Sequence, residues 1–171
     1  VPVTVKFRLG WDDSNRNCVE FGEMAEAAGA SMVTVHGRTR QQLYSGNADW
    51  ANIALVKKAL SIPVFGNGDV FSPEAAEKML EITNCDGVAV ARGSLGNPWL
   101  IPAITRYLDD GIMTAAPDSV ERLIMAYMHC LGLINYKGTR VGVNESRRHL
   151  VNYTKGISGA APFRNQLTQI L

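Results

Sequence analysis

The sequence predicts an α/β protein, with four strand–helix units that form the second half of a (βα)8 TIM barrel and a small all-α helical domain after them. Three observations support this prediction. Valine-rich apolar runs recur at near-regular spacing, a helical pattern follows each run, and polar, glycine-rich residues follow the end of each run. Such runs suit strands buried on both faces, and four strand–helix units indicate a parallel sheet. The runs are residues 3–8, 32–36, 63–66 and 87–91.

Each apolar run is followed by a segment with the spacing and end signals of a helix. After the first run, apolar residues recur at i, i+3, i+4 and i+7 from Phe21, and Gly29 suits the position just past a helix end. Ser72 followed by Pro73 gives an N-cap with proline in the first turn of the third helix. This third helix is expected over residues 74–82, and the second and fourth helices over residues 50–60 and 99–108.

The loops after the strands help to choose between an open doubly wound sheet and half of a barrel. In an open sheet the ligand-binding residues cluster at one switch point, whereas in a barrel they follow every strand. Polar and glycine residues follow all four runs here, so the barrel is favoured and residues 1–112 would be its C-terminal half. The loops are residues 10–12, 37–40, 67–69 and 92–93.

Residues 113–171 differ in pattern and indicate a helical domain. Asp118 can cap a helix that has Glu121 at its third position. A turn is expected around residues 137–142, then a second helix from near Asn144 and a third from near Pro162 that is cut off at the end of the chain. The first helix carries one apolar stripe, made of Leu123, Ile124, Tyr127, Met128, Leu131 and Ile134.

Composition restricts the class of protein. Of 171 residues, 46% are hydrophobic and 19% charged, which is typical of a globular chain. No apolar run reaches the ~18 residues of a membrane helix, and no signal peptide precedes Val1. Because residues 1–7 already have the pattern of a buried strand, we expect the natural start to lie upstream. Cys18, Cys85 and Cys130 are widely spaced, so we expect a reduced cytoplasmic protein with no metal site or disulfide framework.

The two parts of the chain differ in charge. Residues 1–112 contain 10 basic and 13 acidic residues, a net charge of −3, whereas residues 113–171 contain 7 and 3, a net charge of +4. The helical part is therefore the more cationic, as a nucleic-acid-binding module would be. A solvated helical surface would give the same pattern.

Two glycine-containing segments, Asn67-Gly68-Asp69 and Arg92-Gly93, follow the third and fourth runs. In a full barrel these runs would be the seventh and eighth strands, after which phosphate commonly binds to backbone N–H groups. Arg92 adds a permanent charge and a forked donor. The two segments together predict a phosphate site. The alternative is that their glycines only form tight turns, which would give the same sequence pattern.

Lys6 and His36 are polar residues within otherwise apolar strands. A buried lysine needs a partner, and strand alternation places Lys6 and Arg8 on the same face. His36 ends the second strand and leads into a loop that contains Arg38 and Arg40. These positions predict contact with an anionic or electron-rich ligand. The alternatives are a lysine that reaches solvent and a structural histidine.

The aromatic residues of the loop after the second strand and the two other histidines can each be interpreted as functional or as packing residues. Tyr44 lies in the long polar loop after the second strand, where it could stack on a base. Trp50 is expected to pin this loop to the next helix. His129 and His149 are expected to be surface or packing residues.

At these motifs the chain resembles the tRNA-dihydrouridine synthases over essentially its whole length. Four ordered motifs and a matching helical tail are together far more specific than any one of them. The matching segments are VKFRLGWD (5–12), VHGRTRQQLYSGNADW (35–50), VFGNGDV (64–70), VAVARGSLGNPW (88–99) and ESRRHLVNYTKGISGAAPFR (145–164).

The resemblance implies an FMN-dependent barrel followed by a helical tRNA-binding domain. Lys6 is similar to the family's flavin-contacting lysine, and His36 to its histidine at the isoalloxazine edge. Arg38 and Tyr44 become candidates for the uridine pocket. Many members have glycine where Ala91 stands, a change that a backbone contact would tolerate. The flavin-binding segments, mainly around the phosphate, would be Asn67, Gly68, Asp69, Ala91 and Arg92.

The family mechanism implies chemistry that this chain can supply only in part. NADPH reduces FMN, the reduced flavin passes hydride to C6 of uracil, and a cysteine in an Asn-x-Gly-Cys-Pro loop of the first half-barrel protonates C5. That motif does not occur here, and Cys18, Cys85 and Cys130 are expected to be packing residues. The resemblance therefore implies no catalytic residue in this chain. It also implies a partner, either the N-terminal half-barrel or another copy joined through open strand edges.

The same resemblance implies that tRNA is gripped outside the barrel, because the target base must leave its stack. Two other functions stay open: another FMN or phosphate-binding barrel enzyme, such as a different oxidoreductase or a sugar-phosphate isomerase, and a non-catalytic RNA-binding fragment. Flavin binding without tRNA binding would favour the first, and the reverse would favour the second. Candidate tRNA phosphate contacts are Arg140, Arg147, Arg148, Lys155 and Arg164, unless they only form a solvated face.

Overall fold

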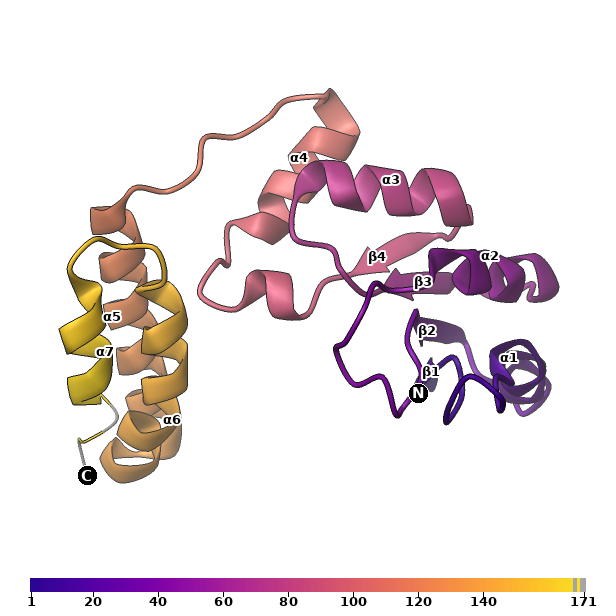
Figure 1. Cartoon of the computed structure of the whole chain (residues 1–171), viewed down its shortest axis with the longest axis horizontal. Coiled ribbons are helices and arrows are strands. Elements are labelled where there is room, and N and C mark those ends of the chain that lie inside the picture. Colours follow the sequence, from indigo (N-terminus) through magenta and orange to yellow (C-terminus); the bar gives the residue numbers. More distant parts are fainter. Residues whose placement is uncertain (168, 170–171) are drawn as a thin grey trace. The chain divides into compact units, whose positions relative to one another are not determined.

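The structure, a computed structural model, describes residues 1–167 and 169. Its sheet has four parallel strands in the order β1-β2-β3-β4, so each strand pairs with its neighbours in the sequence (Figure 1). This confirms the predicted α/β class and the four parallel strands. The strands are β1 (Thr4–Arg8), β2 (Met32–His36), β3 (Val64–Asn67) and β4 (Gly87–Ala89).

Three helices alternate with the strands, at the places the sequence predicts. They are α1 (Cys18–Ala27), α2 (Trp50–Ala59) and α3 (Pro73–Thr83). The side chain of Asp49 accepts a hydrogen bond from the Asn52 N–H and caps α2, and that of Ser72 does the same for α3. A helix after each strand returns the chain to the start of the next parallel strand, which brings all four strand ends to one edge.

The core of this region lies between the sheet and the helices. Val33 and Val35 of β2 are fully buried, as are Ile53 of α2 and Met79 of α3. A side chain on Gly66 of β3 would meet the Met79 sulfur at 2.5 Å, so this glycine leaves room for the methionine. The valine-rich runs of β2 and β3 are thus largely buried because α2 and α3 cover the sheet. The prediction of burial on both faces is wrong for β1 and β4, whose residues are exposed or half-buried.

The described residues form two compact units. The first consists of Val1–Gly93 and Ile104–Ile112, and the second of Ser94–Ala103 and the described residues from Met113 on. Helix α4 (Leu100–Asp110) contributes residues to both units. The functional division at residue 112 expected from the sequence remains a prediction.

Three more helices follow in the second unit: α5 (Ser119–Lys137), α6 (Thr139–Tyr153) and α7 (Ala160–Leu167). The predicted Asp118–Glu121 capping box starts α5. The chain turns within the predicted range of residues 137–142, but Gly138 alone separates the two helices, and α6 begins at Thr139, before the predicted start near Asn144. The predicted start of the third helix near Pro162 agrees with α7, and its end at Leu171 lies outside the described residues.

The apolar stripe of α5 is largely exposed. Leu123, Ile124, Tyr127 and Met128 have 46–62% of their surface accessible, and Ala126 is the buried residue of this helix. Helix α5 packs instead on α6, where Gly142 lies against the backbone of Ile134.

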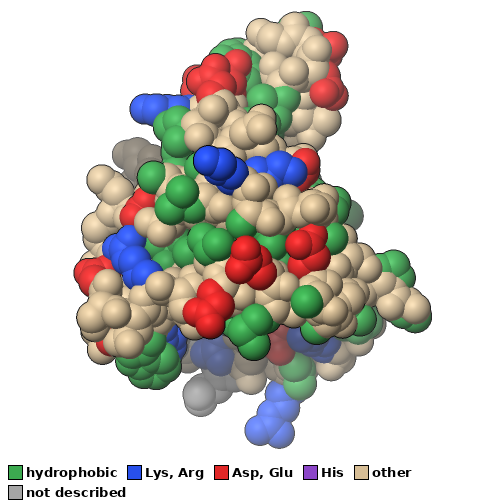
Figure 2. Space-filling model, turned by 90° about the vertical axis from the view of Figure 1, so that its right-hand side faces the viewer, with side chains coloured by type: hydrophobic (Ala, Val, Ile, Leu, Met, Phe, Trp, Pro, Cys, Tyr) green, Lys and Arg blue, Asp and Glu red, His purple; other side chains and the backbone are tan. Residues whose placement is uncertain are grey.

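On the face shown in Figure 2, acidic and basic side chains are interspersed with hydrophobic ones. Within the described residues, no helix is long and apolar enough to cross a membrane.

Candidate functional site

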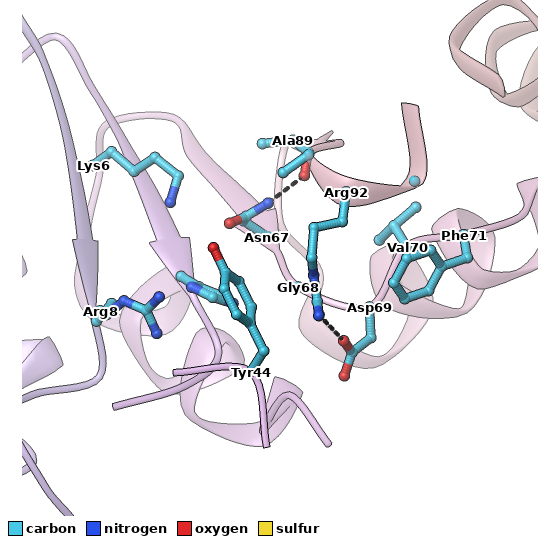
Figure 3. Close-up of a pocket in the computed structure, with 13 residues that line it drawn as sticks. Lys6, Arg8, Tyr44, Asn67, Gly68, Asp69, Val70, Phe71, Ala89 and Arg92 are labelled. Carbon is cyan, nitrogen blue, oxygen red and sulfur yellow. Dashed lines mark hydrogen bonds and ion pairs between the residues drawn. The ribbon is translucent and has the colours of Figure 1, made fainter. Parts of the chain in front are cut away.

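A pocket lies at the carboxyl ends of the four strands (Figure 3). Its volume is about 120 Å³, whereas pockets that enclose a whole small-molecule ligand usually measure roughly 300–1,000 Å³. This chain therefore encloses only part of a cofactor-sized ligand. The lining residues are Lys6, Arg8, His36, Tyr44, Asn67, Gly68, Asp69, Val70, Phe71, Ala89, Ala91, Arg92 and Gly93.

The strand register brings four of these residues into one row. Arg8 is paired with His36, His36 with Asn67, and Asn67 with Ala89. Lys6 lies two residues before Arg8 on β1 and therefore on the same face. The Asn67 side-chain amide donates a hydrogen bond to the Ala89 carbonyl at 2.6 Å, which fixes its orientation at the pocket wall.

Basic groups crowd one side of this pocket. Burial lowers the pKa of Lys6, and the nearby Arg8 lowers it further. The pKa of His36 falls from 6.5 to about 4, first because of burial and then because of the charges on Arg8, Lys6, Arg38 and Arg92. His36 is therefore neutral at pH 7. Mutual repulsion among cations favours binding of an anion, which would relieve it.

Among the described residues, Asp69 is the one acidic residue that lines the pocket, and it already has hydrogen-bond partners. Its carboxylate accepts two hydrogen bonds from Arg38, at 2.8 and 2.7 Å, one from the Ala48 N–H at 2.7 Å and one from Arg92 at 3.1 Å. Burial alone would raise the pKa of Asp69, but the hydrogen bonds from Arg38 and Ala48 hold it below its usual value. The positive charge of the pocket therefore exceeds the negative.

Arg92 and two aromatic rings form the mouth of the pocket. The Arg92 guanidinium lies 4.3 Å from the centroid of the Tyr44 ring and 5.6 Å from that of Phe71. Both rings are more than half exposed. An arginine held over an aromatic face keeps its charge while part of its surface is desolvated, so this corner can present a cation to an anionic group.

Gly68 has a backbone that only glycine adopts readily, with φ of 123°. A Cβ here would lie 2.8 Å from Cβ of Ala48 and 3.1 Å from Cδ2 of His36. Its carbonyl accepts a hydrogen bond from the Trp50 indole at 3.1 Å, so Trp50 pins the end of β3 as well as the loop before α2. The missing side chain therefore lets Ala48 and the His36 ring pack against the backbone at this point of the pocket wall.

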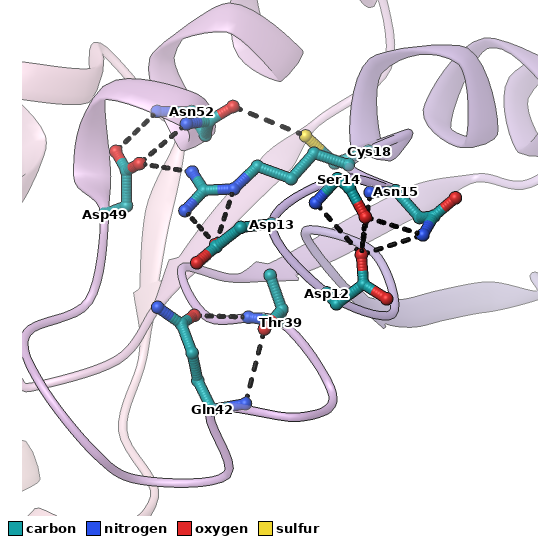
Figure 4. A network of polar contacts seen from close by, with 10 residues as sticks. Asp12, Asp13, Ser14, Asn15, Cys18, Thr39, Gln42, Asp49 and Asn52 are labelled. Carbon is teal, nitrogen blue, oxygen red and sulfur yellow. Dashed lines mark hydrogen bonds and ion pairs between the residues drawn. The ribbon is translucent and has the colours of Figure 1, made fainter.

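A separate polar network holds the loops after β1 and β2 (Figure 4). Arg16 forms ion pairs with Asp13 and Asp49, each at 2.7 Å. Asp49 also caps α2 and binds the Asn52 side chain at 2.7 Å. These contacts tie the loop after β1 to the start of α2 and stiffen the edge of the sheet on which the pocket lies.

All seven residues predicted for the flavin site come together in this pocket. Lys6, His36 and Arg92 line it with Ala91 and with the segment 67–69. Tyr44 lines it as well, but Arg38 does not: its guanidinium is buried, with 2% of the side chain accessible, and bonds to Asp69 and to two loop carbonyls.

The sequence did not identify Val70, Phe71 and Ala89 as lining residues. Phe71 could have been found, because an aromatic residue between the Asn-Gly-Asp segment and the cap of α3 has no core position to fill. Ala89 carries no chemical signal, and its place follows only from the strand register.

The predicted tRNA-binding residues belong to the second unit. Arg147 donates a hydrogen bond to the Asn144 side chain, and Arg148 and Lys155 are exposed. An open pocket of about 570 Å³ near the start of α6 is lined by residues that include Arg140 and Arg147. Two basic side chains thus share one surface near this helix start.

Cysteine does not line the strand-end pocket. Cys18 and Cys85 are buried in the first unit, where burial raises the pKa of Cys18, and Cys130 lies in α5. These placements agree with the packing role predicted for Cys18 and Cys85.

Comparison with known proteins identifies the family. The model for dihydrouridine synthase (Dus) matches residues 1–171. The chain is 52% identical over 170 residues to a probable tRNA-dihydrouridine synthase 1 of Synechocystis, covering 99% of the chain and 48% of that protein. It is 44% identical over 164 residues to a probable tRNA-dihydrouridine synthase of Rickettsia conorii, covering 96% and 50%.

A third relative, tRNA-dihydrouridine synthase B of Pasteurella multocida, is 39% identical over 170 residues, covering 99% of the chain and 51% of that protein. The chain thus spans about half the length of the curated relatives it matches. The motifs at the strand ends, the parallel sheet and these similarities agree, and the chain belongs to the dihydrouridine synthase family.

Proposed function

We propose that this chain forms part of an enzyme that reduces uridine to 5,6-dihydrouridine in tRNA, with FMN as cofactor and NADPH as reductant. The observation that carries the proposal is the excess of positive charge in the strand-end pocket, which is lined by three cations, Lys6, Arg8 and Arg92, and by one carboxylate that Arg38 already holds. An anionic cofactor suits such a pocket. The family relationship indicates which reaction it serves.

The pocket residues fit the two ends of FMN. Arg92 and the backbone of Gly68, both of which line the pocket, suit the phosphate group, since a forked cation and backbone N–H groups are the usual phosphate ligands. Lys6 and His36 would face the flavin ring, to which FMN brings hydride-transfer chemistry when bound. Lys6 would supply positive charge for an electron-rich ring, and neutral His36 would supply a hydrogen-bond donor or acceptor.

We further propose that the proton donor comes from outside this chain, as the family resemblance implies. The absence of cysteine among the described pocket-lining residues supports this. Residues 113–171 would form the tRNA-binding domain, in which Arg147, Arg148 and Lys155 contact phosphates. Such contacts would make binding strongly dependent on salt concentration.

Flavin retention tests the proposal directly. The purified chain, alone and mixed with the N-terminal half of the Synechocystis relative, is incubated with FMN and desalted, and its visible absorption is recorded. We expect a flavin band at least in the mixture. Lys6→Met should weaken FMN binding roughly tenfold, because it removes a cation that lines the pocket.

Lys58→Met is the matched control, since Lys58 is exposed on α2 away from the pocket, and it should leave FMN binding unchanged. A flavin band without tRNA binding would favour a different flavin enzyme. Binding of tRNA with no flavin in either sample would favour an RNA-binding fragment. Neither outcome agrees with the proposed reaction.

The proposal also predicts a partner for the sheet. Among the described strands, β1 pairs only with β2, and β4 only with β3, so each leaves one edge open. Open edges favour pairing with further strands. We expect the isolated chain to self-associate with increasing concentration in sedimentation velocity, and the added N-terminal half to replace this association. A stable monomer at all concentrations would contradict it.

A further inference from the structure

We propose that Arg38 and Asp69 are a positioning pair, which holds the Arg92 guanidinium and the Tyr44 ring at the mouth of the strand-end pocket, and that Arg38 acts without contacting the ligand. This inference rests on the proposed function only for the identity of the ligand. It assigns Arg38 a role different from the uridine contact that the resemblance implied, because the arginine is buried behind the pocket wall.

The Asp69 carboxylate connects three points of the chain, the two ends of the loop after β2 and the segment after β4. It binds Arg38 from the loop after β2, the Ala48 N–H from the end of that loop, and Arg92 from the segment after β4. Asp69 itself has φ of 59°, which is uncommon outside glycine and is maintained here by these contacts. Moving this one carboxylate would therefore disturb all three points.

Arg38 fixes the loop that carries Tyr44. Beyond its two bonds to Asp69, it donates to the Ser45 carbonyl at 3.0 Å and to the Gly46 carbonyl at 2.6 Å. These carbonyls directly follow Tyr44, whose ring lies against Arg92. The buried Arg38 guanidinium thus holds the loop that carries the Tyr44 ring. It also holds the Asp69 carboxylate, which in turn bonds Arg92.

Charge balance gives Arg38 a second effect. If Asp69 had Arg92 as its sole partner, the two would form a neutral pair and the pocket would lose a cation. Because Arg38 shares the carboxylate, the three groups together keep one net positive charge, and Arg92 is the cation among them that lines the pocket. The buried arginine therefore maintains the positive charge that attracts an anion.

Amide hydrogen exchange of residues 39–48 in the full chain tests this inference, and it needs no ligand. Arg38→Lys keeps the charge but cannot make the four bonds of the guanidinium, so exchange in this loop should become about tenfold faster. Asp69→Asn should have the same effect. Arg40→Lys is the matched control, since Arg40 is exposed in the same loop, and should leave exchange unchanged.

A double-mutant cycle separates positioning from general support of the fold. If Arg38 acts through Asp69 on Arg92, then Arg38→Lys and Arg92→Lys should each weaken FMN binding roughly tenfold, and the double variant should be little worse than either. Additive losses, or wild-type exchange in Arg38→Lys, would overturn the inference. Faster exchange in a chain that never binds FMN would refute the proposed cofactor and leave the positioning pair supported.

Discussion

Lowering the pH from 7 to 4 is expected to destabilise the folded chain by an amount on the order of 3 kcal/mol through His36 alone. The pKa of this residue falls from 6.5 to about 4 in the folded state, and each pKa unit corresponds to ~1.4 kcal/mol. Between these values the unfolded chain binds a proton that the folded chain does not, so stability rises with pH. The loss should begin as pH falls through 6.5 and level off below about 4.

Urea denaturation at a series of pH values, for the wild type and for His36→Gln, measures this effect. The variant should lose the His36 part of the pH dependence and keep the part that comes from His149, whose pKa burial also lowers. Histidine titration by NMR gives the pKa directly, and an anion bound beside Lys6 and Arg8 should raise it. A His36 pKa near 6.5 in the folded chain would contradict the crowded cationic pocket.

Replacing Gly142 with alanine is expected to destabilise the second unit by about 1–3 kcal/mol, even though alanine is the better helix former. The added Cβ would lie 2.6 Å from the backbone N and Cα of Ile134 on α5. Contact with backbone cannot be relieved by a change of rotamer, so α5 and α6 must move apart. Thermal unfolding followed by circular dichroism at 222 nm measures the loss.

Gly132→Ala is the matched control on the same pair of helices. Gly132 lies within α5, and a Cβ there would have no neighbour within 4 Å. This substitution should stabilise the chain by up to about 1 kcal/mol, because it raises helix propensity and costs no packing. If both alanines had the same effect, the close contact between α5 and α6 would not exist in solution.

Local signals in the sequence were sufficient to predict much of the fold. The spacing of the valine-rich runs predicted the four strands, and the Ser72 and Asp118 caps predicted where α3 and α5 begin. These features depend on residues within one or two turns of one another, so they can be read without knowing the tertiary contacts. The parallel order of the strands then brought Lys6, His36 and Asn67 to one pocket.

The tertiary structure alone decided where α6 begins and what Arg38 does. The sequence predicted a turn around residues 137–142, but Gly142 is helical because its missing side chain lets α6 approach Ile134 of α5. Arg38 and Arg92 both follow a strand in a polar loop, and the sequence gives no reason to separate their roles. The difference arises from the Asp69 carboxylate, which is 31 residues from Arg38 and 23 from Arg92.

The sequence by itself therefore determined the family, the parallel sheet and the set of residues at the strand ends, since each of these depends on short-range pattern and strand order. The tertiary structure decided which charges face the pocket and which are buried behind it. Burial and ion pairing depend on the atoms that surround a group in space. For Arg38 those atoms belong to Gly46, which precedes β3 in the sequence, and to Asp69, which follows it.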